Sequence, residues 1–293
     1  MIGTVIADRY QVVQRLGAGA TSAVFLVDDT ISGQRLAMKL FTSDPRDRTV
    51  EGRFKREVRA AQRLAHDNIV VTHDCGRLPD GRMYLTMEPV VGTPLDVRLR
   101  ERGPLPIPTA LGVLAEIADA LHHAHQRDVI HRDIKPHNVV LAPHPSGGTI
   151  VKVLDFGLAK ITASDAGDSQ VLSKDGLAFG TPQYMSPEQW GTRPPDGRTD
   201  IYAVGCVGFE LLIGEPPFVG KPLQLVTSHL TKPPRVPSQV DPSAGITPAL
   251  DALILRCLAK DPRERFQTGA DLCAAIQQLP EYRPLRVLQP SKR

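Results

Sequence analysis

The stretch His131-Arg132-Asp133-Ile134-Lys135-Pro136-His137-Asn138 decides how the rest of the sequence is interpreted. It brings a carboxylate, a cation and a side-chain amide close together in the chain. A second acid follows in the turn-forming sequence Asp155-Phe156-Gly157. Two acids, an amide and a lysine suit a site that holds a metal-bound phosphate beside a hydroxyl nucleophile. We therefore ask whether the remaining sequence supplies the other parts of such a site.

The composition predicts an ordinary globular chain. Its 293 residues are 41% hydrophobic and 23% charged, and the formal net charge is +3. Lys and Arg are scattered, so we expect no nucleic-acid partner. The apolar runs fall short of the ~20 residues that span a bilayer, and the start of the chain does not resemble a signal peptide. We expect a cytoplasmic protein with no membrane segment in this chain.

The cysteines and histidines do not form a recognisable metal-binding pattern. The four cysteines contain no CxxC pair, which is typical of reduced thiols in a reducing compartment. His122, His123 and His125 lie close together on an expected helix, but no second cluster of ligands accompanies them. We expect no metal centre at these histidines.

Gly17 and Gly19 lie between two expected strands at residues 10–16 and 22–28. Glycines in a tight hairpin let backbone N–H groups approach a phosphate closely. Most Gly-x-Gly pairs are plain turns, so this pattern alone leaves both interpretations open. Ser22 stands where a third glycine is usual in phosphate-binding loops.

Lys39 lies on a third expected strand, residues 34–41, and Glu57 lies on an expected helix, residues 50–64. Glu57 sits beside the apolar face of that helix, where an unpaired carboxylate is costly. We therefore predict an ion pair between Lys39 and Glu57. Strands at 68–73 and 83–88 would complete a small antiparallel sheet of five strands with this helix against it.

After this sheet the sequence becomes mainly helical. The boundaries we predict are an N-terminal lobe at 1–88, a hinge at 89–94, a C-terminal lobe at 95–279 and a tail or linker at 280–293. The expected helices are 108–126, a buried helix at 201–212 that starts at Thr199 or Asp200, and two helices capped by Thr247 and Thr268. A hairpin joins 138–141 to 151–154, and a long polar loop follows from 158 to 186.

Taken in order, these motifs resemble those of a eukaryotic-like protein kinase, and most closely those of the bacterial Ser/Thr kinases. The resemblance spans roughly residues 8–280. It implies an α+β, bilobal fold with a small antiparallel sheet lobe carrying one main helix and a larger, mainly helical lobe. The motifs that carry it are Gly17-x-Gly19, Ala37-Met38-Lys39, Glu57, His131-Arg132-Asp133 with Asn138, Asp155-Phe156-Gly157 and Ser186-Pro187-Glu188.

The resemblance implies an ATP-dependent Ser/Thr protein kinase that uses Mg²⁺, with Mn²⁺ as an alternative ion. Asp133 would orient the substrate hydroxyl and accept its proton, and Lys135 would stabilise the transferring phosphoryl group. Lys39, held by Glu57, would neutralise phosphate charge. Asn138 and Asp155 would bind the metal through oxygen. Residues implied in nucleotide binding are Gly17, Gly19, Ser22, Val24, Ala37, Lys39, Met87, Glu88, Val90 and Leu141.

The same resemblance implies regulatory and structural roles. Arg132 would receive a phosphate from the activation segment, with Ser173 as the autophosphorylation site, although a polar loop with no dominant site stays an alternative. Thr181 would hydrogen-bond near the catalytic acid and lysine. Glu188 would form a buried ion pair with Arg265. Asp200 would brace the catalytic loop.

Three functional readings follow. The favoured one is an active Ser/Thr protein kinase that autophosphorylates and acts on protein substrates. A pseudokinase scaffold conflicts with the intact set of catalytic and metal-binding residues. A small-molecule kinase would not need residues 180–188 or Arg265. A homodimer is left open, as is the idea that this chain is the intracellular domain of a longer, membrane-anchored kinase.

Overall fold

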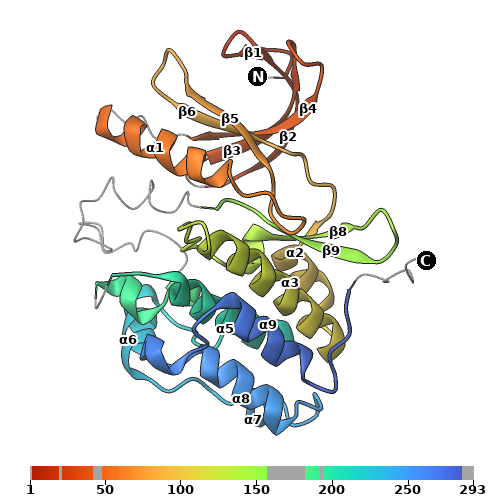
Figure 1. Cartoon of the computed structure of the whole chain (residues 1–293), viewed down its shortest axis with the longest axis vertical. Coiled ribbons are helices and arrows are strands. Elements are labelled where there is room, and N and C mark those ends of the chain that lie inside the picture. The colour runs from red at the N-terminus through yellow and green to blue at the C-terminus, as the bar shows by residue number, and fades with distance from the viewer. Residues whose placement is uncertain (1, 20–21, 42–47, 157–181, 192–193, 286–293) are drawn as a thin grey trace.

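A computed structural model describes residues 2–19, 22–41, 48–156, 182–191 and 194–285, with residues 48–50 described by their backbone only. The described chain forms two lobes (Figure 1). The smaller lobe is built on an antiparallel sheet and the larger one is mainly helical. This α+β, bilobal arrangement confirms the expected fold class.

The first lobe contains a six-stranded sheet in the order β1-β2-β3-β4-β6-β5. Its neighbouring strands all pair antiparallel. Helix α1, Arg48–Ala61, packs against this sheet through Phe54 and Val58, which join Ala37 and Met87 in one apolar cluster. The strands are β1 Val5–Ile6, β2 Tyr10–Ala18, β3 Ser22–Asp29, β4 Arg35–Phe41, β5 Thr72–Arg77 and β6 Met83–Met87.

The strand predicted at residues 68–73 is wrong. The structure places β5 at Thr72–Arg77, a polar sequence with a weak strand signal. The apolar residues that suggested a strand serve the junction of the lobes instead, where Ile69 forms a parallel bridge with Val153. The N–H of Val70 donates to the oxygen of Val153 at 3.0 Å. Burial, rather than strand pairing within the first sheet, therefore explains the apolar pattern.

The second lobe begins with a small sheet and continues as helices. The sheet has the order β7-β8-β9, with β7 Thr93–Pro94, β8 Val139–Pro143 and β9 Thr149–Val153. The helices are α2 Leu95–Arg102, α3 Ile107–His125, α5 Gly197–Ile213, α6 Pro222–Thr231, α7 Pro237–Val240, α8 Pro248–Cys257 and α9 Gly269–Gln277. Short 3₁₀ helices lie at Pro136–Asn138 (η1), Pro182–Tyr184 (η2), Pro187–Trp190 (η3) and Pro262–Glu264 (η4).

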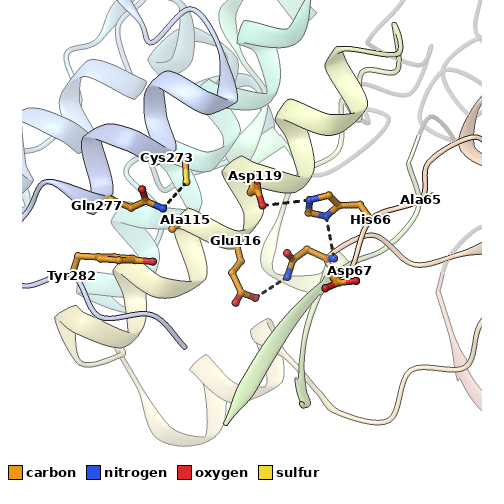
Figure 2. Close-up of a pocket in the computed structure, with 10 residues that line it drawn as sticks. Ala65, His66, Asp67, Ala115, Glu116, Asp119, Cys273, Gln277 and Tyr282 are labelled. Atoms are coloured by element: carbon orange, nitrogen blue, oxygen red, sulfur yellow. Dashed lines mark hydrogen bonds and ion pairs between the residues drawn. The ribbon is translucent and has the colours of Figure 1, made fainter. Parts of the chain in front are cut away.

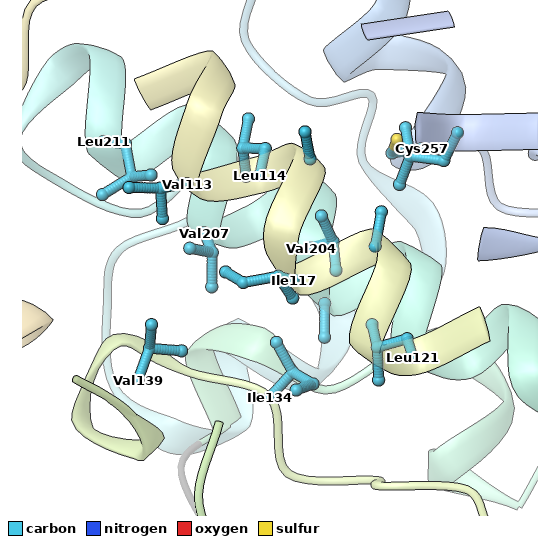
Figure 3. Close-up of a cluster of buried hydrophobic side chains, with 14 of the residues drawn as sticks. Val113, Leu114, Ile117, Leu121, Ile134, Val139, Val204, Val207, Leu211 and Cys257 are labelled. Carbon is cyan, nitrogen blue, oxygen red and sulfur yellow. The ribbon is translucent and has the colours of Figure 1, made fainter. Parts of the chain in front are cut away.

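The core of this lobe lies between α3 and α5, as Figure 3 shows. Helix α5 is buried on nearly every face, as its apolar sequence predicted. A Cβ on Gly205 would lie 2.6 Å from the Cβ of Cys257, so glycine is required for α8 to pack this closely. The predicted start of α5 was wrong, because the N-cap is Asp196, whose side chain accepts from the N–H of Arg198 at 2.9 Å.

Part of the predicted tail packs against the same core. Tyr282 and Leu285 lie against it, and the main-chain oxygen of Leu285 accepts a hydrogen bond from Thr149 at 3.4 Å. Gly112 of α3 leaves room for Leu285, whose Cγ would lie 2.8 Å from an added Cβ. Residues 280–285 therefore belong to the folded lobe, and residues 286–293 lie outside the described range.

Asp200, inside α5, holds the backbone of the stretch 131–138. Its carboxylate is fully buried and accepts hydrogen bonds from the N–H groups of His131 and Arg132, at 2.8 and 2.7 Å. It also lies 2.8 Å from the Nε2 atom of His125. Burial opposes ionisation, but these hydrogen bonds hold the pKa of Asp200 below its usual value.

Glu188 and Arg265 form the buried ion pair that the resemblance implied. The guanidinium makes two bonds to the carboxylate, at 2.7 and 2.9 Å, and Arg265 is fully buried. Its remaining N–H groups donate to the main-chain oxygens of Ala259, Arg198 and Lys260. Every charge in this pair is therefore matched, which a buried pair requires.

Among the described helices, none combines the length and the apolar character needed to cross a membrane.

The buried ion pair predicts that two neighbouring arginines, Arg263 in η4 and Arg265 just after it, contribute very differently to the free energy of unfolding. Arg265→Ala would leave Glu188 buried without its partner and should lower the free energy of unfolding by about 3–5 kcal/mol. Arg263→Ala removes an ion pair whose arginine is 76% exposed, and should cost about 1 kcal/mol or less. Urea unfolding of both variants measures the difference. Equal losses would contradict a dominant role for the buried pair.

Asp200 predicts how stability depends on pH. Its pKa is depressed in the folded state, so its contribution is present above the unfolded carboxylate pKa of about 3.9 and is lost as the pH falls. The free energy of unfolding should therefore fall between pH 5 and pH 3, less steeply in Asp200→Asn than in the wild type. One such carboxylate contributes at most about 1.4 kcal/mol per pH unit. Urea unfolding at several pH values measures the slopes, and identical slopes would argue against this role.

Candidate functional site

Apolar side chains hold the stretch 131–138 in its middle and just after its end. Ile134 and Val139 are buried in the core between α3 and α5 (Figure 3). Asp133 and Lys135 alternate with these buried residues and remain partly exposed. This alternation therefore holds the backbone through its apolar side chains and keeps Asp133 and Lys135 partly exposed.

Asp133 is surrounded by the other polar groups of its own loop. Lys135 Nζ lies 2.7 Å from Asp133 Oδ2. The amide Nδ2 of Asn138 donates to the main-chain oxygen of Asp133 at 2.7 Å and to Oδ2 at 3.1 Å. Because Asn138 donates through nitrogen toward Asp133, its carbonyl oxygen is directed elsewhere and can serve a different partner.

Asp155 is brought to this loop from the end of β9. Its φ angle is 61°, in the left-handed region that non-glycine residues adopt only when held there. The following residue, Phe156, is buried and meets His131 edge to face, with ring centroids 4.7 Å apart. His131 Nε2 also lies 2.7 Å from the oxygen of Leu154. The sequence interpretation gave His131 no role, yet it joins the two acidic segments.

Lys39 reaches this site from β4 of the first lobe. Its Nζ lies 2.6 Å from Asp155 Oδ2, and both side chains are 17% exposed. Burial opposes ionisation of Asp155, but the charge of Lys39 holds its pKa below the usual value. The positive charge of Lys135 acts in the same direction. Two acids, an amide and two lysines from separate segments are therefore gathered in one place.

The predicted partner of Lys39 is different in the structure. Lys39 pairs with Asp155, and within the described chain no ion pair joins it to Glu57. Glu57 is half-buried on α1, and its charge acts on Arg132. The local sequence argument predicted a cation for Glu57 but could not predict that Lys39 contacts Asp155, which lies far from it in the sequence.

The residues predicted around an adenine ring belong to two apolar clusters, one in each lobe. Val24, Ala37, Met87 and Val90 belong to the cluster under the first sheet, and Ala37 pairs with Met87 across β4 and β6. Leu141 packs on the core of the second lobe. Four of the five predicted residues therefore share one apolar cluster, and the fifth belongs to the core of the other lobe.

The hinge backbone has an acceptor and a donor to offer. The side chain of Glu88 accepts hydrogen bonds from Lys152 Nζ at 2.9 Å and from the N–H of Val71 at 3.2 Å. The N–H of Glu88 donates to the main-chain oxygen of Val71 at 2.9 Å. In the described chain, the main-chain oxygen of Glu88 and the N–H of Val90 bond to no other protein group.

The glycine hairpin between β2 and β3 is open on its face. The N–H of Gly19 donates to the oxygen of Ser22 at 2.8 Å, which closes the turn. Among the described residues, a Cβ on Gly17 would meet no other atom within 4 Å, and one on Gly19 would approach the oxygen of Ser22 at 4.0 Å. Packing within the protein therefore does not account for the two glycines.

Of the three residues predicted to have regulatory roles, only Arg132 lies among the described residues. Ser173 and Thr181 lie outside the described residues, as does Gly157. Arg132 is described, and its Nε atom is buried without a hydrogen-bond partner in the described chain. Burial lowers the pKa of Arg132, although Asp200 and Glu57 oppose this effect. A buried guanidinium with an unused donor is suited to an anionic partner.

A separate cavity of about 410 Å³ lies away from these residues, between α3, α9 and the segment before β5 (Figure 2). His66 lies 3.3 Å from Asp119, and Asn68 donates to Glu116 at 2.7 Å. Neither Asp133 nor Asp155 lines this cavity. Its polar groups join the segment before β5 to α3.

Comparison with known proteins identifies the family. Residues 10–278 match the protein kinase domain. The serine/threonine-protein kinase PknB of Mycolicibacterium smegmatis is 38% identical over 92% of this chain and 43% of its own length. Pkn3 of Myxococcus xanthus, also a serine/threonine-protein kinase, is 38% identical over 96% of this chain and 52% of its own length.

The comparison with solved structures also finds a kinase domain. The kinase domain of Mycobacterium tuberculosis PknI is similar with a TM-score of 0.74 and 29% sequence identity, covering 95% of this chain and 98% of that domain. The chain spans about half the length of the curated relatives that it matches. On the matched range and the identity to these relatives, the chain belongs to the protein kinase family.

Proposed function

We propose that the chain is a Ser/Thr protein kinase domain that transfers the γ-phosphoryl group of ATP to serine and threonine hydroxyls of proteins. The observation that carries this proposal is the contact of Lys39 with Asp155, at 2.6 Å, beside the loop that holds Asp133, Lys135 and Asn138. Phosphoryl transfer depends mainly on positioning and on stabilising negative charge. This set of side chains supplies both.

ATP would bind between the lobes. The main-chain oxygen of Glu88 and the N–H of Val90 offer an acceptor and a donor to the adenine edge. Val24, Ala37 and Leu141 would enclose the ring, with Met87 behind it. The backbone of Gly17, Gly19 and Ser22 would approach the phosphates, because the two glycines leave that face open. Lys39 would neutralise the α- and β-phosphates.

The donor set fits Mg²⁺, with Mn²⁺ as a second ion of similar preference. Asp155 has a second carboxylate oxygen outside its contact with Lys39, and the side-chain oxygen of Asn138 is directed away from Asp133. Hard cations prefer such oxygen ligands. When bound, the ion would neutralise phosphate charge.

The remaining steps belong to the residues of the loop. Asp133 would orient the substrate hydroxyl and accept its proton as the oxygen attacks phosphorus. Lys135, 2.7 Å from Asp133, would donate to the transferring phosphoryl group and stabilise its charge. Glu57 would join Lys39 in a nucleotide-bound arrangement, which requires α1 to move relative to the arrangement described above.

The boundaries of the functional units follow the same proposal. We place the first lobe at 1–88, the hinge at 89–94 and the second lobe at 95–279, with the packed residues 280–285 as an extension of it. The partners would be ATP and protein substrates, in the cytoplasm, where ATP is available. A homodimer and attachment to a longer membrane-anchored protein are compatible with a chain about half as long as its relatives.

Removing the proposed base tests the function directly. With labelled ATP, Mg²⁺ and a generic basic protein, the wild type should label itself and the added protein, and Asp133→Asn should transfer about 100-fold less or lower still. Asp80→Asn changes an acid in the exposed turn between β5 and β6 and should match the wild type. Absence of label in every reaction would refute the proposal and favour a scaffold.

A second test concerns regulation. We expect Ser173 to carry the main autophosphorylation, because a phosphate there would bring about 1.5 to 2 negative charges toward Arg132. Phosphopeptide mapping of the active protein should find Ser173 modified, and Ser173→Ala should reduce activation. An active protein modified at Ser164 or Ser169, with Ser173 unmodified, would rule this site out. Thr181 should remain unmodified, because we assign it to hydrogen bonding beside Asp133 and Lys135.

A further inference from the structure

The side chain of Gln189 joins two loops that are distant in sequence. It lies on η3, and its Nε2 atom donates a 2.8 Å hydrogen bond to the main-chain oxygen of Arg132. Its Oε1 atom accepts from the N–H of Ser186 at 3.0 Å and from the Ser186 hydroxyl at 3.2 Å. An amide has one accepting and one donating end, and each faces a partner of the opposite kind. A side chain without both ends cannot make all of these bonds.

The oxygen that Gln189 holds belongs to the peptide group between Arg132 and Asp133. The N–H of the same peptide group donates to Nδ1 of His131 at 3.2 Å. A peptide group is planar, so fixing its oxygen and its N–H fixes its rotation. That rotation sets the direction in which the Asp133 side chain leaves the backbone. Gln189 therefore acts on Asp133 without touching its carboxylate.

The backbone at this point needs support. Arg132 has a φ angle of 67°, in the left-handed region that side chains other than glycine seldom adopt. Such a residue keeps its conformation only when its surroundings hold it. Asp200 holds the N–H of Arg132 at 2.7 Å, and Gln189 holds its oxygen at 2.8 Å.

The residues next to Gln189 are buried and held by hydrogen bonds. The preceding residue, Glu188, is held by two bonds to the fully buried Arg265 and by the hydroxyl of Thr199 at 2.8 Å. Ser186, which binds the other end of the Gln189 amide, is also fully buried. A displacement of η3 would therefore be passed to the peptide group that precedes Asp133.

We propose that Gln189 is a positioning residue that sets the direction of the Asp133 carboxylate and couples it to residues 182–190. This inference rests on the proposed phosphoryl transfer. It assigns to Gln189 a role in turnover, in addition to its role as the capping residue of η3.

Two substitutions separate positioning from capping. Gln189→Glu keeps an acceptor for Ser186, and glutamate serves this capping position as well as glutamine does. Its carboxylate, however, has no N–H for the oxygen of Arg132 and repels it. Gln189→Ala loses both bonds without adding repulsion. A capping role predicts that the alanine variant is the weaker one, and a positioning role predicts that the glutamate variant is the weaker one.

We expect kcat to fall about 10- to 100-fold in Gln189→Glu, the range that follows from a small displacement of a catalytic group, and less in Gln189→Ala. KM for ATP should stay unchanged, because no ATP-binding residue is altered. Gln224→Ala is the matched control, since Gln224 caps α6 through the N–H of Lys221 at 3.1 Å and is exposed. Its kcat should equal that of the wild type.

Hydrogen exchange and thermal melting supply readouts that do not depend on turnover. In Gln189→Glu, amide exchange within residues 131–138 should become faster while the melting temperature stays close to that of the wild type. Wild-type kcat in Gln189→Glu, or a loss of kcat explained by a lower melting temperature, would overturn the proposal. If the wild type itself transferred no phosphate, the proposed function would fail, and unchanged exchange in Gln189→Glu would still refute the positioning geometry.

Discussion

The carboxylate of Asp200 is the constraint on which the site depends. It lies inside α5, fully buried, and accepts the N–H groups of His131 and Arg132 while contacting His125. A buried carboxylate without partners is strongly unfavourable. If the loop left Asp200, that carboxylate would lose its partners, so the buried helix α5 determines where the backbone next to Asp133 lies. The fold and the site are joined through backbone amides rather than through the polar side chains that do the chemistry.

A second buried polar group joins the lobes. The Nδ2 atom of Asn68 donates to Glu116 Oε2 at 2.7 Å and to the main-chain oxygen of Val151 at 2.8 Å, and the main-chain oxygen of Asn68 accepts from the N–H of Val153 at 2.8 Å. The segment before β5 is thereby hydrogen-bonded to β9 of the second lobe. Asp155 comes two residues after the end of β9. The hydrogen bonds of Asn68 to β9 therefore help to position Asp155 relative to the first lobe, which carries Lys39.

Sequence reasoning succeeded where the signal was local or came as an ordered set of motifs. The buried helix around residues 201–212, the caps at Thr247 and Thr268, and the bilobal fold were all predictable. Sequence reasoning failed where one pattern of residues fitted two different structural roles. Ile69 and Val70 were read as a strand because burial at a lobe junction and burial in a sheet give the same apolar pattern. Gln189 was missed because only the folded chain brings it to Arg132.

The two halves of the site differ in how firmly they are held. The backbone on either side of Asp133 is held by three contacts. Asp200 accepts from the N–H of Arg132, Gln189 donates to the oxygen of Arg132, and Ile134 is buried in the core. Lys39 of the first lobe is joined to Asp155 of the second by an ion pair of 2.6 Å. The backbone around Asp133 is anchored within the second lobe by hydrogen bonds that do not involve the Arg132 guanidinium. A movement of the first lobe relative to the second would therefore displace Lys39 more readily than Asp133, because fewer contacts have to be exchanged.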